Sequence, residues 1–515
     1  MRRTTIATAV AAVLLLVAPA EAEDQVVHDH WFAQFQRETK SGWSHERRMR
    51  SEQDGKAVII TETESAMVRG PGGELLKTPM LFSTRYVEDE AGAVLSYATS
   101  ADIGMGPQTR EGTVANGVVS AIDDGKPRSV PYAEGALGPA AVDRAVAAAL
   151  KPGAKFETVR FSPHDPDKGD VLVWKVPAET KLVDVLGRYA WLFPVQMTDS
   201  TTIPETRLMG GGGGLWGGSM NFGLIRYFRT EEVVAKADRA PSSFVTDRIV
   251  APDRVIPAAA ERTRVVLRLS RAEGRVGELP SSKFQRVSTN AESGDVEIEL
   301  SVGEPKGELV VWMWPYIGDD QDAAYLAESK LIELSHPRLK QYAERMVGEL
   351  KDGLSCARVL ELRVKQMVRP APANVGIASA AGVISARTGD STETAVLVVG
   401  LARALGLPAR MVAGFTYWAP DQWPAGRYPN GAFAFHAWAE IYAGENLWHP
   451  VDPMRMDGTE PKERVPELVG HGGFGATHVA VLRSAADSEQ PFTDIVLPVL
   501  EFMDGLSIEV VEPKK

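Results

Sequence analysis

A helix whose start and end are both indicated by the sequence lies in the C-terminal third of the chain. It constrains the fold more than any other segment. Asp390 precedes a run of apolar residues at helical spacing, and Glu393 follows three residues later, which is the pattern of a capping box. We therefore predict Asp390 as the N-cap and Ser391 as the first helical residue. Gly406 suits the position after the helix, and Pro408 prevents its continuation.

Two strands are predicted after this helix. Polar or aromatic residues alternate with small or apolar ones over 436–442, and 447–452 forms the next strand. A hairpin centred on Gly444 places His436 directly opposite Asp452, on one face of the sheet, with Cβ atoms about 5 Å apart. Asp452 is then expected to accept the Nδ1 hydrogen of His436 and orient the ring, although a purely structural His–Asp pair has the same pattern. A slip of one residue would place the two on opposite faces.

Together these segments resemble the transglutaminase-like branch of the papain-type fold. The resemblance rests on three blocks, Gly389-Asp390-Ser391-Thr392-Glu393, His436-Ala437-Trp438-Ala439-Glu440 and Trp448-His449-Pro450-Val451-Asp452-Pro453. The string Gly475-Ala476-Thr477-His478-Val479 is similar to an element of many bacterial relatives. Members of the family carry a catalytic Cys at the helix start, then a His and an Asp. The resemblance implies that Ser391, His436 and Asp452 occupy these three positions.

The serine at the nucleophile position decides the expected chemistry. A thiol has a pKa near 8.5 and can rest as a thiolate–imidazolium ion pair, whereas a serine hydroxyl is far less acidic. A helix dipole contributes only about 1–2 kcal/mol, which does not close that gap. Serine can still act if His436 removes its proton during attack and an oxyanion hole is preorganised. Many bacterial relatives also have His where this chain has Thr394.

Three functions stay open on this basis. The first is a catalytically silent or weak pseudoenzyme that binds a peptide, protein or cell-envelope component. The second is an acyl hydrolase, acyltransferase or peptidase-like enzyme that uses Ser391, His436 and Asp452. The third is a structural envelope protein that acts through its β domains. Aromatic residues over 417–423 lie in a proline-containing loop and could line a groove for a peptide or glycan.

The rest of the sequence predicts an α+β, multidomain protein, because 515 residues are too many for one core. Short β-branched runs such as 57–63 and 172–176, one helix at 140–150 and a glycine-rich loop at 209–218 indicate a β-rich region over 23–250. Alternating runs at 264–269, 296–300 and 309–314 predict a β-sandwich-like domain over 251–318. The transglutaminase-like core is assigned to 319–515, and it starts with helices at 320–334 and 337–367.

The first 22 residues have the features of a signal peptide. Arg2 and Arg3 precede an apolar stretch over 6–17, and Ala20-Glu21-Ala22 fits a cleavage site. We expect an exported chain, periplasmic or secreted, with no transmembrane segment after cleavage. An uncleaved N-terminal anchor is the alternative. The net charge of −12 disfavours nucleic acid as a partner, because that would need a basic surface.

Cofactor and metal sites are not expected. His28-Asp29-His30 invites a metal interpretation but has no further spaced ligands nearby. Cys356 is the only cysteine, so no internal disulfide forms. Its helical, apolar surroundings predict a buried thiol rather than a replacement nucleophile.

Overall fold

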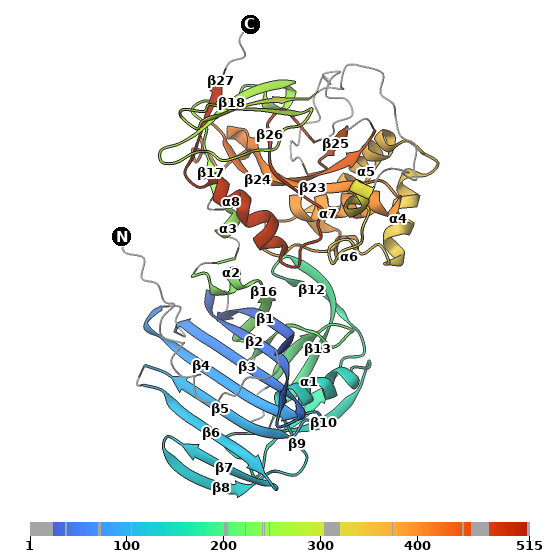
Figure 1. Cartoon of the computed structure of the whole chain (residues 1–515). Helices are drawn as coiled ribbons and strands as arrows, with labels where there is room; N and C mark the ends of the chain where they lie inside the picture. Colours follow the sequence, from blue (N-terminus) through green and yellow to red (C-terminus); the bar gives the residue numbers. More distant parts are fainter. Residues whose placement is uncertain are drawn as a thin grey trace.

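The computed structural model describes residues 24–302, 320–454 and 473–511, except for short gaps at 37–38, 71–73, 105, 200–203, 222, 239, 242, 247, 373 and 445–446. The predicted signal peptide lies outside the described residues. The chain folds into an N-terminal lobe built on a large antiparallel sheet and a C-terminal α+β lobe (Figure 1). The predicted α+β, multidomain fold class is confirmed.

The N-terminal lobe is one sheet in which two runs of sequential strands meet at the antiparallel β1–β16 pair. Its sheet has sixteen strands in the described residues, ordered from β8 back to β1, then β16 to β13, and then β11, β10 and β9, with β12 paired to β13. The strands of its first half are β1 (Gln25–Gln36), β2 (Thr39–Gln53), β3 (Lys56–Arg69), β4 (Leu75–Asp89), β5 (Val94–Asp102), β6 (Gln108–Ala115), β7 (Val118–Asp123) and β8 (Lys126–Pro131). Those of the second half are β9 (Ala136–Leu137), β10 (Lys155–Arg160), β11 (Asp170–Lys175), β12 (Lys181–Val185), β13 (Arg188–Thr198), β14 (Glu205–Met209), β15 (Leu215–Met220) and β16 (Ile225–Thr230).

Helix α1 (Pro139–Ala148) packs against this sheet. Val142 and Val146 of α1 join Leu172 and Trp174 in a small core. The Glu88 carboxylate accepts the N–H groups of the first turn, from Ala140 at 2.9 Å and Ala141 at 3.0 Å, where the helix dipole favours a negative charge.

Most N-terminal expectations are confirmed. The predicted strands 57–63 and 172–176 fall largely within β3 and β11, and the predicted helix corresponds to α1. The glycine-rich loop is shorter than expected. Residues 210–214 form the turn, with Gly213 at φ 85°, but residues 215–218 already belong to β15.

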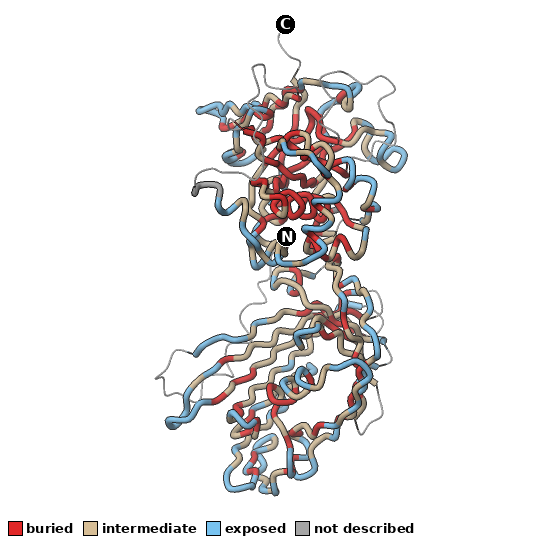
Figure 2. Tube along the Cα trace, turned by 90° about the vertical axis from the view of Figure 1, so that its right-hand side faces the viewer, coloured by how far each residue is buried: buried red, intermediate tan, exposed pale blue. Residues whose placement is uncertain are grey.

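The C-terminal lobe surrounds one buried helix. Its five-stranded sheet has the order β17 (Ile249–Val250), β24 (Ala432–Tyr442), β23 (Ala409–Trp418) and β26 (His478–Ser484), with β25 (Trp448–Val451) paired to β24. Helix α7 (Ser391–Ala404) packs on this sheet, and three helices cover it, α4 (Pro337–Val347), α5 (Gly353–Met367) and α6 (Ala380–Ala386). Nearly every residue of α7 is buried, and the buried residues around it form the large apolar core of this lobe (Figure 2).

Two helix predictions before α7 are wrong in extent. The expected helix 320–334 is only a 3-10 turn, Asp320–Tyr325, after which Ile332 enters the core from non-helical chain. The expected helix 337–367 is two helices. Gly348 adopts φ 62° and ends α4, and Asp352 restarts the chain as N-cap of α5 by accepting the N–H of Ser355 at 2.7 Å. A left-handed residue ends a helix whatever the apolar periodicity beyond it.

A second sheet completes this lobe. It has the order β19 (Gln285–Thr289), β20 (Val296–Ser301), β18 (Arg264–Arg271) and β27 (Leu506–Val511). The predicted strands 264–269 and 296–300 are present in β18 and β20, and the predicted strand 309–314 lies outside the described residues. Leu267, Leu269 and Ile298 share one apolar core with α7 and β23. In the described part of the chain these strands therefore form a single sheet on the C-terminal core.

The two lobes are joined by specific bonds. The short helices α2 (Glu232–Lys236) and α3 (Ser243–Thr246) lie between them (Figure 1). Gly376 N–H donates to Leu186 O at 2.7 Å, and Glu231 accepts the N–H groups of Phe492 and Thr493 at 2.8 Å each. Helix α8 (Leu497–Met503) follows this contact. None of the helices in the described residues combines the length and apolarity needed to cross a membrane.

Candidate functional site

The start of α7 is held as the sequence predicts. Asp390 Oδ1 accepts the N–H of Thr392 at 2.7 Å, and Glu393 Oε2 accepts the N–H of Asp390 at 2.8 Å, which completes the capping box. Burial, followed by the neighbouring Asp390 charge, raises the pKa of Glu393 well above its usual range. Ser391 is the first residue of the helix and is half-buried.

His436 and Asp452 form the expected pair, but through a different register. Tyr442 pairs with Trp448 and Ala439 with Val451, so every pairing is offset by two residues from the predicted hairpin. The reason is the turn, because Leu447 N–H closes onto Gly444 O at 2.7 Å and the turn is centred beyond Gly444. A shift of two preserves the face of each side chain. His436 Nε2 therefore still lies 2.8 Å from Asp452 Oδ2.

The nitrogen that faces Asp452 is also corrected. The prediction used Nδ1, whereas Nε2 makes the bond, which leaves Nδ1 of His436 for another partner. Ser391 Oγ reaches the same strand, where it accepts the N–H of Ala437 at 3.3 Å. Within the described residues, no hydrogen bond joins Ser391 to His436.

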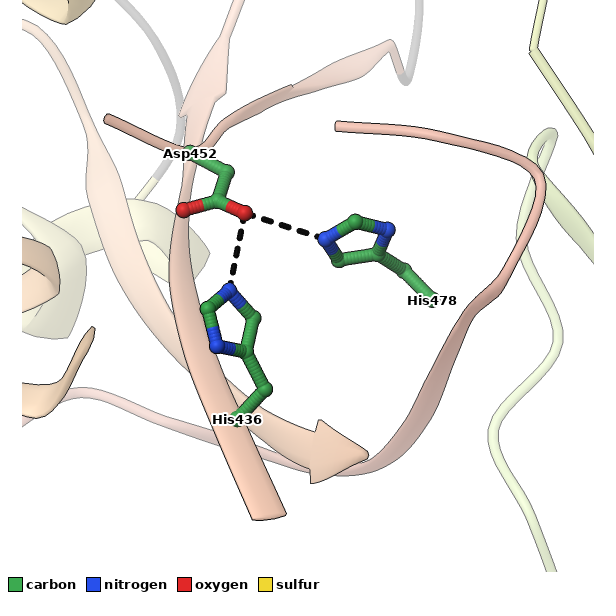
Figure 3. A group of neighbouring side chains, drawn as sticks. All are labelled: His436, Asp452 and His478. Atoms are coloured by element: carbon green, nitrogen blue, oxygen red, sulfur yellow. Dashed lines mark hydrogen bonds and ion pairs between the residues drawn. The ribbon is translucent and has the colours of Figure 1, made fainter. Parts of the chain in front are cut away.

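His478 is a third member of this group. Its Nε2 lies 3.0 Å from the same Oδ2 of Asp452, so both rings are directed at one carboxylate oxygen (Figure 3). Burial alone would raise the pKa of Asp452, but the charges of His436 and His478 and their hydrogen bonds hold it well below its usual range. Gly414 of β23 lets β26 approach, since a Cβ at Gly414 would lie 1.9 Å from the backbone oxygen of Val479.

Glu361 holds the backbone of Asp452 in place. Its Oε1 accepts the N–H of Asp452 at 2.9 Å and the N–H of Gly473 at 3.1 Å. Burial raises the pKa of Glu361 to about 8. The sequence analysis did not single out this residue. Its one signal is helical spacing, which puts it on the buried face of α5 with Ala357 and Val364.

A cavity of about 560 Å³ adjoins His436 and Asp452. Its lining includes His436, Asp452 and His478 and two further segments, 255–261 and 416–422. Trp418 stands edge-on to His436, with 6.1 Å between ring centroids. Of the aromatic residues predicted in a loop over 417–423, Tyr417 and Trp418 line the cavity but belong to the end of strand β23, and Trp423 is not among the lining residues. The part of this segment that follows β23 lines the cavity through Ala419, Asp421 and Gln422. Ser391 is not among the lining residues.

Comparison with known protein families identifies a domain in this part of the chain. Residues 340–453 match the family model described as the transglutaminase-like superfamily. The chain contains a transglutaminase-like domain. The matched range runs from α4 to the residue after Asp452, so it contains Ser391, His436 and Asp452.

Solved structures resemble parts of the chain only distantly. The periplasmic domain of TgpA from Pseudomonas aeruginosa, bound to ethylmercury, is 16% identical, with a TM-score of 0.26 over 42% of this chain and 94% of that domain. A β-barrel-like protein of a domain of unknown function from Brucella abortus is 12% identical, with a TM-score of 0.29 over 40% of this chain and 95% of that protein. No curated protein matches the chain. Likenesses this distant carry no inference about activity.

The other candidate residues do not reach the transglutaminase-like site. Cys356 is fully buried in α5, does not line the cavity and lies 4.0 Å from Leu350 O. In the N-terminal lobe, His28 lies 3.2 Å from Glu46, while Asp29 bonds His45 at 2.7 Å. Because residues of a strand alternate between faces, His28-Asp29-His30 does not converge on one point.

Proposed function

We propose that this protein is an exported pseudoenzyme whose transglutaminase-like domain binds a peptide, protein or cell-envelope component without turning it over. The observation that carries the proposal is the placement of Ser391. It stands at the nucleophile position, but its hydroxyl is directed at the backbone N–H of Ala437 instead of at His436. Export is proposed from the signal-peptide pattern over 1–22.

Physical chemistry supports a silent nucleophile. The hydroxyl of Ser391 accepts a backbone N–H and makes no hydrogen bond to His436 in the described residues. Its proton would have to be removed during attack, since no resting ion pair forms at neutral pH. His436 and Asp452 keep their hydrogen bond, although the chain has a serine where the family has its nucleophilic cysteine.

The cavity supports a binding role. Trp418 and Tyr417 give it an aromatic wall, and 255–261 contributes backbone and small side chains on the other side. A cleft that combines apolar and aromatic walls with a set of polar side chains is a common form of a small-ligand or peptide-side-chain site. An open volume of this size weighs against a mere spacer role for the domain.

A pair of nucleophile variants tests the proposal. Wild type and Ser391→Ala are treated with a fluorophosphonate serine probe, and Ser391→Cys with a thiol-directed acyl donor. We expect wild type to stay unlabelled and Ser391→Cys to form an acyl-enzyme, because the helix N-terminus and His436 favour a thiolate there. Ser391→Cys/His436→Ala is the matched control and should lose most of this reactivity. Labelling of wild type that Ser391→Ala abolishes would overturn the pseudoenzyme proposal.

A serine acyl hydrolase or acyltransferase is the second candidate. One observation favours it, because an Nε2–H bond to Asp452 leaves the lone pair of His436 on Nδ1, the nitrogen free to act as a base. Positive fluorophosphonate labelling in the experiment above would select this candidate.

A further inference from the structure

We propose that His436, Asp452 and His478 form a binding site for one divalent transition-metal ion of the class of Zn²⁺ or Co²⁺. Two imidazole Nε2 atoms and one carboxylate oxygen converge, at 2.8 and 3.0 Å from the shared Oδ2 and all within 4.8 Å of one another (Figure 3). Two imidazoles and one carboxylate are a donor set that borderline divalent metals use when a further coordination position stays open.

The three ligands are held by rigid elements. His436 lies in β24 opposite Gly414, and His478 opens β26 opposite Thr416, so both histidines flank β23. Asp452 directly follows β25, and its Oδ1 accepts the N–H of Met454 at 3.0 Å, which fixes the carboxylate. All three side chains are buried, with exposed fractions of 3%, 3% and 1% for His436, His478 and Asp452. Such preorganisation reduces the cost of assembling a site.

The surroundings fit a bound cation. His478 Nδ1 lies 3.0 Å from Gly475 O and 3.1 Å from Gly475 N. Metal binding at Nε2 selects the tautomer with its proton on Nδ1, for which Gly475 O is the acceptor, in place of the tautomer whose Nδ1 accepts the Gly475 N–H. The residues lining the cavity include the carboxylates Glu261, Asp421 and Asp452, and none of these lining residues is Lys or Arg. The cavity reaches all three ligands, which gives a water or ligand donor access to the open position.

Metal binding and serine chemistry exclude each other at this site. A metal on His436 Nε2 replaces the Nε2–H bond to Asp452 and moves the ring proton to Nδ1. A protonated Nδ1 cannot take a proton from Ser391. The inference goes beyond the proposed function, and it supplies a second reason for a silent site.

Cobalt titration of the full mature chain tests the site. The protein is treated with a chelator, desalted and titrated with Co²⁺ while its visible d–d absorption is recorded. We expect one equivalent to bind, with the intense bands of low coordination number, and Zn²⁺ to displace it. His478→Gln and Asp452→Asn should weaken binding by about 100-fold or more, since removing even an outer-shell partner typically costs about 10–100-fold. Ser391→Ala and the exposed His164→Gln are controls and should bind like wild type.

Two results would overturn the inference. One is an absence of Co²⁺ uptake by wild type at about 100 μM, a weak affinity for such a donor set. The other is wild-type affinity in His478→Gln. If the variants do not fold, proton NMR of Co²⁺-loaded wild type decides, because two metal-bound histidines give two shifted, exchangeable Nδ1–H signals. The titration needs no cavity ligand, so its failure leaves the pseudoenzyme proposal untouched.

Discussion

Glu361 receives two backbone N–H groups, from Asp452 and Gly473, in a fully buried position. Glu361 therefore holds the backbone in place at two points, Asp452 and Gly473. An N–H left without an acceptor in such a place costs about 1–3 kcal/mol. The position of Asp452 therefore depends on Glu361, a residue of α5 that is 91 residues away along the chain.

Replacement of Glu361 should show how much its side chain stabilises the fold by accepting these two N–H groups. Glu361→Ala removes the acceptor for both N–H groups and is expected to lower the free energy of unfolding by about 2–4 kcal/mol. Glu361→Gln keeps an amide oxygen at the same place and should lose less than about 1 kcal/mol. Urea denaturation followed by circular dichroism measures both. Equal losses in the two variants would show that the carboxylate does not act through these bonds.

At the scale of elements, hydrogen bonds to both carboxylate oxygens of Asp390 hold the N-terminus of α7 in place. Asp390 caps the helix through Thr392 and also accepts the N–H of Asn374 at 3.2 Å with its other oxygen. The cap therefore ties α7 to the connector before α6. The orientation of Ser391 toward β24 follows from this tie, since Ser391 is the next residue.

The cap gives an element-scale prediction. Asp390→Ala should destabilise the protein by about 1–2 kcal/mol, the usual effect of losing an N-cap. In the Ser391→Cys background it should also slow acyl-enzyme formation, because the helix start is no longer fixed. Asp390→Asn retains an acceptor oxygen and serves as the matched control. Urea midpoints and labelling rates are the two readouts, and an unchanged midpoint in Asp390→Ala would contradict the role of the cap.

The local features of this site were predictable, and the long-range ones were not. Glu393 lies in the first turn of α7, and Asp390 and Gly406 lie directly beside its two ends, so spacing along one short segment was enough to predict the cap and the stop. The face shared by His436 and Asp452 was predicted by parity, but their register was not, because the hydrogen bond from Leu447 to Gly444 sets the turn. Glu361 meets Asp452 across 91 residues, and no period in a sequence encodes such a contact.

At the scale of the whole molecule, the two lobes have separate apolar cores. The C-terminal core extends from Val234 to Ile508, while the N-terminal sheet holds three small clusters around Trp174, Tyr97 and Ile60. Many residues of the N-terminal lobe are only half-buried, and its apolar clusters are small (Figure 2). The half-buried His30 of this lobe is a place where pH acts on stability.

Acid should destabilise the N-terminal lobe through His30. Burial, followed by the charge of Arg229, lowers the pKa of His30 to about 3, from 6.5 in an unfolded chain. Between these values the unfolded chain binds a proton that the folded chain does not, so stability falls as pH falls from 6.5 towards 3. His30→Asn should reduce the drop in Tm between pH 7 and pH 4 by a few degrees, since about 1 kcal/mol corresponds to about 2–4 °C. His164→Asn is the exposed control. Identical pH profiles for wild type and His30→Asn would refute the assignment.

The pairing of β18 with β27 has a consequence for the order of events during synthesis. Arg268 and Glu509, which bond across these strands, are separated by 241 residues. The second sheet therefore stays open at one edge until residue 511 has been made, whereas most strands of the N-terminal sheet can pair with their neighbours as they emerge. A ribosome-bound chain lacking only its last strand would hold a finished first lobe and an unfinished second one, and a protease should digest the second lobe first.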